Sequence, residues 1–143
     1  MNGKLDGEYI VYNKHGAILK TINFKKGCKH GKETDFFLNG VIKSVVNYKN
    51  NIKEGTFTKY FNNGSIYYKL NIINDIFYGY YKEYYKNGVL KTCLYKSLYT
   101  SLRFLKNYSN NGTLLSEYHY CSNFDSTTTY DYYGNIINNQ FLI

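Results

Sequence analysis

The feature that most constrains the fold of this chain is an internal repeat with a period of 24 residues. A first glycine recurs at Gly7, Gly31, Gly55 and Gly79, and Arg103 takes its place in the fifth copy. A second glycine stands nine residues after each of these positions. This second set is Gly16, Gly40, Gly64, Gly88 and Gly112. Since six copies starting near residues 7, 31, 55, 79, 103 and 125 cover almost everything, we expect residues 1–143 to form one array with a degenerate, capping last copy.

The same side-chain classes recur inside each copy. An aromatic ladder stands five residues after the first glycine position, at Tyr12, Phe36, Tyr60, Tyr84 and Tyr108. An aliphatic residue follows the second glycine, and another comes four residues later, as in Leu90 and Leu94. Even spacing predicts that these two aliphatic side chains share one face of a strand. Aromatic and β-branched residues also favour strands.

Asparagine–glycine pairs between the strands predict β-hairpin turns. In the fourth copy, a three-residue loop over 86–88 would place Gly88 in the left-handed region as a bulge. That register sets Tyr84 directly opposite Leu90, which pairs the aromatic ladder with the first aliphatic set.

The turns that lead to the next copy use residue types that tolerate positive φ. These pairs are Lys26-Gly27, Asn50-Asn51 and Asn74-Asp75. Each copy thus becomes two strands and two turns. The predicted fold is all-β, a single-layer antiparallel meander of tandem β-hairpins with about twelve strands and no substantial helix.

Four tyrosines stand close together in the fourth copy, at Tyr80, Tyr81, Tyr84 and Tyr85. In a strand, Tyr80 and Tyr84 share one face and Tyr81 and Tyr85 share the other. No second sheet covers either face of a one-layer meander. Tyrosine suits such a surface, because its ring is apolar and its hydroxyl tolerates water. We therefore expect these rings to be mainly structural.

Residues 79–90 follow the pattern Gly-x-Tyr-x-x-Tyr-Tyr-x-Asn-Gly-x-Leu. This pattern resembles the MORN repeat, in the bacterial-type variant found in YwqK-like antitoxin proteins. Residues 7–18, 31–42 and 55–66 match it well, whereas the last two copies are degenerate. The resemblance implies a curved ribbon of β-hairpins that serves as a scaffold for binding or dimerisation. It also implies links to membranes and phosphoinositides, and no catalytic motif.

The formal net charge is +8, and it is unevenly distributed. Residues 1–107 hold all 18 lysines and arginines and carry a net charge of +11. A basic surface favours nucleic acid, anionic lipid or an acidic protein as partner. An AT-rich genome is an alternative explanation of the charge, because lysine, asparagine, isoleucine, tyrosine and phenylalanine are all read from A/T-rich codons.

The start of the chain is charged and lacks the apolar stretch of a signal peptide. No run of apolar residues is long enough for a transmembrane helix. The 3 cysteines are an odd number at irregular spacing, which suits a reducing compartment. We expect a cytoplasmic protein, of a cell or of the host of a virus.

The sequence offers no constellation typical of an enzyme, a cofactor site or a metal site. Carboxylates are scattered, and the glycines are spaced as turn residues instead of forming a phosphate loop. Cys28 with His30 and His119 with Cys121 form two pairs nearly four copies apart. In a meander they would lie roughly 35–40 Å from each other, too far for one zinc ion. A site shared between subunits stays open.

The favoured function is a non-catalytic scaffold that binds another protein in an inhibitor, antitoxin-like or adaptor role. Binding of nucleic acid or an anionic phospholipid surface through the lysine-rich residues 1–107 is the alternative, and a structural homo-oligomer is a third. The fourth copy is the candidate partner-binding region, since its tyrosine density is highest and the turn pattern breaks just after it, at Leu98-Tyr99. The candidate residues are Tyr81, Tyr85, Tyr99, Arg103, Lys82 and Lys86.

Overall fold

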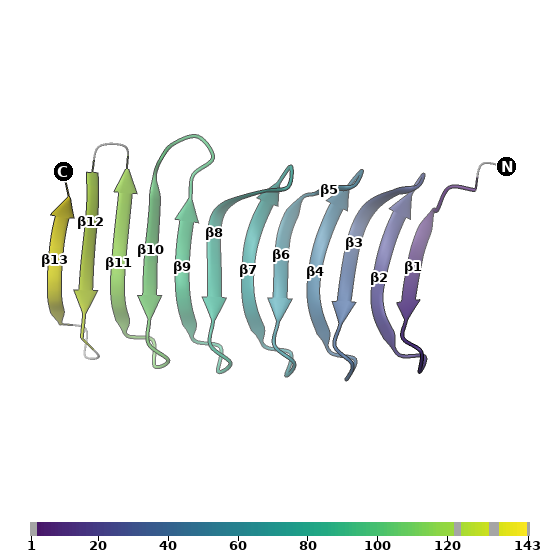
Figure 1. Cartoon of the computed structure of the whole chain (residues 1–143), viewed down its shortest axis with the longest axis horizontal. Helices are drawn as coiled ribbons and strands as arrows, with labels where there is room; N and C mark the ends of the chain where they lie inside the picture. The colour runs from purple at the N-terminus through teal and green to yellow at the C-terminus, as the bar shows by residue number, and fades with distance from the viewer. Residues whose placement is uncertain (1–2, 122–123, 132–134, 143) are drawn as a thin grey trace.

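The computed structural model describes residues 3–121, 124–131 and 135–142, and these residues form one open antiparallel sheet a single layer thick (Figure 1). Its strands are β1 (Gly7–Tyr12), β2 (Ile18–Lys25), β3 (Cys28–Phe36), β4 (Ile42–Lys49), β5 (Ile52–Lys53), β6 (Gly55–Tyr60), β7 (Ile66–Ile73), β8 (Ile76–Tyr84), β9 (Leu90–Lys96), β10 (Arg103–Tyr108), β11 (Leu114–Cys121), β12 (Phe124–Tyr130) and β13 (Ile136–Leu142). They lie side by side in chain order, with the two-residue β5 paired to β4 alone. The predicted all-β meander of hairpins is confirmed.

The hairpin turns have the predicted geometry. Gly88 has a φ of 86°, its N–H donates to the Tyr85 carbonyl at 2.9 Å, and the Tyr85 N–H donates to the Val89 carbonyl at 2.8 Å. Tyr84 lies opposite Leu90, as expected. The corresponding residues of the aromatic ladder pair in the same way, at Tyr12–Ile18, Phe36–Ile42, Tyr60–Ile66 and Tyr108–Leu114. The returning turns also take positive φ at the predicted residues, Lys26-Gly27, Asn50-Asn51 and Asn74-Asp75.

Gly88→Val is expected to lower the free energy of unfolding by about 1 kcal/mol or more, because a β-branched residue is strained at positive φ. No atom lies within 4 Å of the place a Cβ would take, so the cost comes from the backbone alone. Chemical denaturation of the variant measures it. Lys86→Val, in the same turn but not at positive φ, is the matched control. Equal stability of the two variants would show that the turn tolerates a side chain at Gly88.

A one-residue β-bulge follows each hairpin turn and changes which faces the side chains occupy. In the fourth copy Tyr84 pairs with Leu90, but Glu83 pairs with Thr92, so Lys91 is the additional residue. A bulge of this kind offsets the alternation of side chains along the strand.

The prediction that the two aliphatic sets share a face is therefore wrong. Ile18 and Ile42, of the first set, are each 39% exposed, whereas Ile22 and Val46, of the second set, are 9% and 7% exposed. The first set lies opposite the aromatic ladder on one face, and the second set lies on the other face. The two sets are four residues apart in sequence, but the bulge places one additional residue between them. They therefore lie three positions apart along the partner strand, which puts them on opposite faces.

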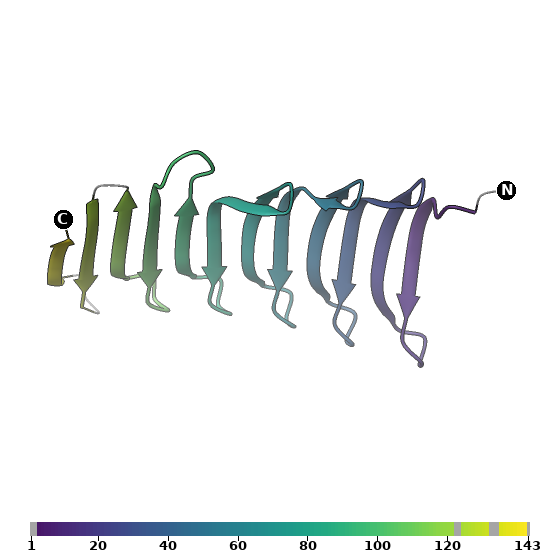
Figure 2. The same ribbon diagram turned by 45° about the horizontal axis from the view of Figure 1, so that its top comes forward.

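The first glycine of the repeat marks a second irregularity, at which strands bend. Gly79 has a φ of 67°, and the register slips beside it, since Leu70 pairs with Tyr81 but Asn71 pairs with Tyr78. The upper part of β8, like that of β3, bends across the top of the sheet (Figures 1 and 2). In the fifth copy, where Arg103 replaces glycine, β9 and β10 pair without any slip.

The register defines two faces of the sheet. We call one the glutamate face, after Glu33 in its central row, and the other the lysine face, after the lysines in its central row. The glutamate face carries Tyr9, Ile22, Glu33 and Val46, and further along Phe57, Leu70, Tyr81, Leu94, Leu105 and Tyr118. The lysine face carries Thr21, Thr34, Val45, Thr58, Lys69, Lys82, Cys93, Lys106 and Glu117.

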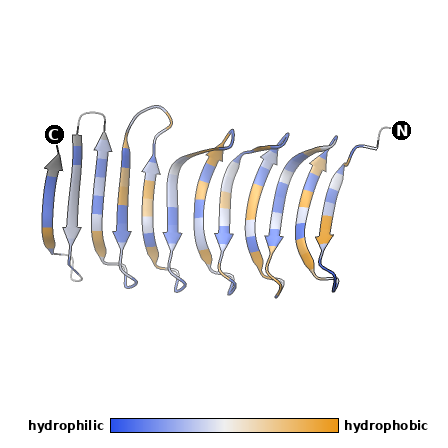
Figure 3. Ribbon diagram, in the orientation of Figure 1, coloured by the Kyte–Doolittle hydropathy of each residue, from blue (hydrophilic) through white to orange (hydrophobic). Residues whose placement is uncertain are grey.

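Because no second layer covers the sheet, burial comes only from neighbours in the same layer. Among the described residues, the buried hydrophobic side chains are Ile22, Val46 and Cys93, and none of them is fully enclosed. Apolar and polar residues alternate along most strands (Figure 3). The core is thus two rows of side chains, one on each face, and both faces remain available to a partner.

Candidate functional site

The acidic residues of the glutamate face are neutralised within the chain. Glu33, whose side chain is 7% exposed, accepts hydrogen bonds from the Nζ atoms of Lys20 and Lys29. Burial alone raises the pKa of Glu33, but the two lysines outweigh it and the net pKa is lowered, so the carboxylate is charged. Glu83 pairs in the same way with Lys91, at 2.7 Å. The carboxylates of this face are therefore neutralised, whereas Arg103 and Lys96, which pair in register on it, have no carboxylate partner among the described residues.

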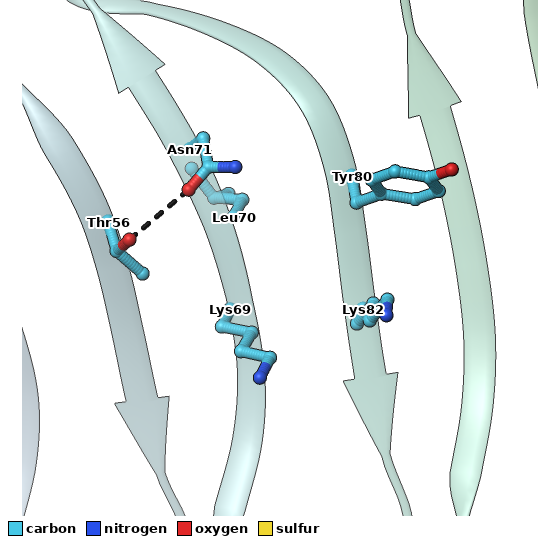
Figure 4. Close-up of a pocket in the computed structure, with 6 residues that line it drawn as sticks. All are labelled: Thr56, Lys69, Leu70, Asn71, Tyr80 and Lys82. Carbon is cyan, nitrogen blue, oxygen red and sulfur yellow. Dashed lines mark hydrogen bonds between the residues drawn. The ribbon is translucent and has the colours of Figure 1, made fainter.

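On the lysine face, two lysines stand opposite each other. Lys69 of β7 pairs in register with Lys82 of β8. Both side chains are half-buried, and neither has a carboxylate partner among the described residues. Lys106, further along the same row, does have one, since its Nζ lies 2.9 Å from Glu117 Oε2. Thr56, Asn71 and Tyr80 complete an open pocket of about 300 Å³ around the lysine pair (Figure 4).

Three aromatic rings gather beside this pocket, and we refer to Tyr80, Tyr95 and Phe104 as the aromatic cluster. The ring centroids of Tyr80 and Tyr95 are 5.1 Å apart, those of Tyr80 and Phe104 5.9 Å, and those of Tyr95 and Phe104 5.6 Å. His119 extends the cluster, with its ring 6.2 Å from that of Phe104. Tyr80 is 47% exposed. Tyr95 and Phe104 are half-buried, and Lys82 Nζ lies 5.3 Å from the centroid of the Tyr80 ring.

A second open pocket, of about 430 Å³, lies on the other side of the aromatic cluster. Tyr80 and Tyr95 form one wall, and Leu98 and Tyr99 of the loop between β9 and β10 form another. The Ser97 hydroxyl oxygen accepts hydrogen bonds from the Tyr99 and Thr100 N–H groups, which folds the loop. Tyr99 is 94% exposed. The break in the turn pattern therefore builds a loop that lines the second pocket.

The aromatic cluster arises where two residues of the repeat, an asparagine and a glycine, are both replaced. In the first three copies an asparagine stands eight residues before the glycine of the next copy and packs near it, at Asn23–Gly31, Asn47–Gly55 and Asn71–Gly79. In the fourth copy this pair becomes Tyr95 and Arg103. Comparing asparagine positions between copies is the sequence signal that would have identified Tyr95.

Two of the candidate residues from the sequence, Tyr99 and Lys82, lie next to the aromatic cluster. Tyr99 shares the second pocket with Tyr80, and Lys82 Nζ lies 5.3 Å from the centroid of the Tyr80 ring. Sequence reasoning missed Tyr95 and Phe104, and it assigned Tyr80 a structural role.

Tyr81 and Tyr85 share the other face, as predicted, and both make internal hydrogen bonds. The Tyr81 hydroxyl donates to Glu83 Oε2 at 3.2 Å, and its ring centroid is 5.5 Å from that of Tyr68. Burial, with Glu83 close by, raises the pKa of the Tyr81 phenol, so the hydroxyl stays protonated. The Tyr85 hydroxyl donates to the Tyr108 carbonyl at 2.9 Å.

Arg103 and Lys86 lie away from the aromatic cluster. Arg103 is the first residue of β10. Its guanidinium carbon lies 5.0 Å from the centroid of the Tyr120 ring, so its aromatic neighbour is Tyr120 and not Tyr99. Lys86 is exposed in the hairpin turn between β8 and β9, at the end of β9 that is remote from the loop carrying Tyr99.

The two Cys/His pairs do not converge. Cys28 and His30 lie in β3 and His119 lies in β11, and six strands separate these two strands in the sheet. The side chain of Cys121 falls outside the described ones. Within the described part of the chain, no three His, Cys, Asp or Glu side chains are grouped to hold a metal ion. That part also contains no helix long and apolar enough to cross a membrane.

Comparison with known proteins supports the repeat reading. The family model of the MORN repeat variant matches residues 29–50, 53–74, 77–97 and 105–122, together more than half of the chain. The matched segments contain the whole aromatic cluster except Phe104, which directly precedes the last segment. No curated protein matches the chain.

Proposed function

The chain belongs to the MORN repeat variant family, whose repeats commonly serve as non-enzymatic scaffolds that interact with proteins or membranes, and from this premise we propose that it binds another protein through the aromatic cluster. The observation that carries the proposal is the group of three partly exposed rings, of which Tyr80 lines two open pockets. Rings of this kind are the usual anchors of protein interfaces.

The role that fits this proposal is that of an inhibitor, an antitoxin-like protein or an adaptor. Each of these acts by covering a surface of its partner and needs no chemistry of its own. We place the interaction in the cytoplasm, because Cys28 and Cys93 are both free thiols and thiols persist in a reducing compartment.

Protein is favoured over nucleic acid by how the rings and charges are arranged. Tyr95 and Phe104 stack on each other, with their planes 11° apart, instead of standing separately to receive bases. The lone arginine of the chain, Arg103, lies against Tyr120 on the other face. Base readout relies mostly on arginine at the contact surface.

The test is to capture partners of the tagged full chain from a nuclease-treated lysate of its source, identify them by mass spectrometry, and measure their affinities for variants. Tyr80→Ala and Phe104→Ala are expected to weaken binding about tenfold or more, as is common for central aromatic anchors. Tyr12→Ala is the matched control, because Tyr12 is 53% exposed and lies outside the aromatic cluster.

The sequence-based candidates Tyr81, Tyr85 and Arg103 belong in the same series. Loss of affinity in these variants, with the fold intact and Tyr80→Ala unaffected, would move the docking surface to the glutamate face. An affinity that falls by roughly a thousandfold between about 50 and 200 mM salt would instead indicate phosphate contacts and favour a nucleic acid or an anionic surface.

A further inference from the structure

Lys69 and Lys82 present a local conflict that the sheet does not resolve. They are directly opposite in register on neighbouring strands, and like charges at such positions are destabilising. Both side chains are half-buried. The Tyr80 ring, 5.3 Å from Lys82 Nζ, compensates one of the two charges in part, but no carboxylate of the described residues pairs with either lysine. An arrangement that costs stability and lacks such a partner points to a ligand that supplies one.

No group on the described part of the lysine face can neutralise this pair. Thr58 pairs with Lys69 on one side, and Cys93 pairs with Lys82 on the other. Cys93 is 7% exposed, and burial raises the pKa of its thiol, so it is neutral. The carboxylate of Glu117, further along the row, is bound to Lys106. Within the pocket, the unbalanced charge is thus that of two lysines on neighbouring strands.

The pocket adds an uncharged donor to these two cations. The Thr56 hydroxyl donates to Asn71 Oδ1 at 3.2 Å, which fixes the orientation of the Asn71 amide. Its Nδ2 then points from β7 toward β8, on the side of the lysine pair (Figure 4). Among the described residues Nδ2 has no hydrogen-bond acceptor, so the pocket presents donors with no acceptor of their own to satisfy them.

The lysine pocket is continuous with the aromatic cluster through one residue. Tyr80 lines the lysine pocket on one side and takes part in the aromatic cluster on the other. A ligand that reaches both regions must place a negative group next to an apolar group. An acidic side chain followed or preceded by a bulky apolar side chain in a peptide has this arrangement.

We propose that the pocket between Lys69 and Lys82 binds the carboxylate of an aspartate or glutamate side chain of the protein partner, while a neighbouring apolar side chain of that partner packs on the aromatic cluster. This inference rests on the proposed function. Charge complementarity sets the occupant: the charge of the lysine pair suits a single carboxylate. A nucleic acid backbone or a membrane surface needs an extended row of cations, and here the row is interrupted by Thr58 and Cys93.

The test uses a displayed library of random short peptides, selected in parallel on the full-length chain and on its Lys69→Gln/Lys82→Gln variant. The wild-type selection is expected to enrich peptides with an acidic residue next to a large apolar one. The variant selection should keep the apolar residue and lose the acidic one. For an enriched peptide, fluorescence polarisation should show a loss of about tenfold or more for the double variant, and for the peptide with its acid changed to an amide. Lys32→Gln, at an exposed lysine remote from the pocket, is the control and should change little.

The Lys69→Gln/Lys82→Gln variant is expected to fold, because it removes a like-charge pair. Its thermal stability should equal or exceed that of the parent chain. Peptides that bind through apolar residues alone, with no acid preference, would overturn the carboxylate site and leave the aromatic docking surface standing. A selection that yields no binding peptide would overturn both. Binding of oligothymidylate or phosphatidylserine vesicles that disappears in the double variant, without acidic peptides, would make the pocket a phosphate site and overturn the proposal.

Discussion

Tyr81→Ala is expected to lower the free energy of unfolding by about 2 kcal/mol or more, whereas Tyr80→Ala should lower it by less than about 1 kcal/mol. The two residues are neighbours of the same type on opposite faces. Tyr81 stands in the central row of the glutamate face between Leu70 and Leu94, and its ring also packs near Tyr68. Its removal leaves a gap in a row that has no second layer to close it.

Tyr80 is 47% exposed and lines two open pockets, so removal of its ring gives up mainly the contacts with Tyr95 and Phe104 and costs less packing than removal of the Tyr81 ring. Denaturant unfolding of the two variants, followed by circular dichroism and with the same slope as the parent chain, gives the comparison. Equal destabilisation would show that the aromatic cluster is part of the core. A stable Tyr81→Ala chain with impaired partner binding would support the glutamate face as the docking surface.

Deletion of residues 125–143 is expected to convert the chain to a dimer or to larger aggregates. The deletion removes nearly all of β12 and all of β13, so β11 becomes the terminal strand. A terminal strand presents unpaired N–H and C=O groups that can pair with another molecule. β11 carries Leu114, Leu115, Tyr118 and Tyr120, whereas the centre of β13 carries Asn138, Asn139 and Gln140. The centre of the new edge thus lacks the three consecutive side-chain amides that stand at the centre of β13, whose two ends are apolar.

Sedimentation velocity of the full-length and shortened chains, at matched concentrations, measures the effect. A lysine introduced into the new edge, as Ser116→Lys in the shortened chain, should reduce association, since charged side chains on edge strands block pairing. A shortened chain that sediments like the full-length one would mean that the last copy does not protect the edge.

The turn geometry of this protein can be predicted from its sequence, because it depends on residues close together in the chain. An asparagine–glycine pair favours a hairpin, and Gly88 adopts the positive φ that such a loop needs. Asn50-Asn51 and Asn74-Asp75 do the same for the returning turns. With both turns fixed every 24 residues, an antiparallel meander in chain order follows. The strands and their order were therefore predictable.

The distribution of side chains between the two faces depended on backbone irregularities that spacing does not reveal. Sequence spacing placed Leu90 and Leu94 on one face, but the bulge at Lys91 separates them. The asparagine that stands eight residues before a first glycine, such as Asn71 before Gly79, is visible in the sequence. The register slip that lies beside Gly79 is not, because it is a property of two paired strands. Tyr95 and Arg103 replace the asparagine and the glycine in the fourth and fifth copies, and there β10 pairs with β9 without a register slip.

The candidate site itself is a product of register between strands. Lys69 and Lys82 are far apart along the chain, and only the exact pairing of β7 with β8 brings them opposite each other. Tyr80 and Phe104 come from different copies of the repeat and meet across β9. A shift of one residue in either pairing would send one partner to the other face. Turn chemistry acts over a few residues and can be read directly, whereas which side chains become neighbours across strands is decided by hydrogen-bond register, and bulges set that register only once the sheet has formed.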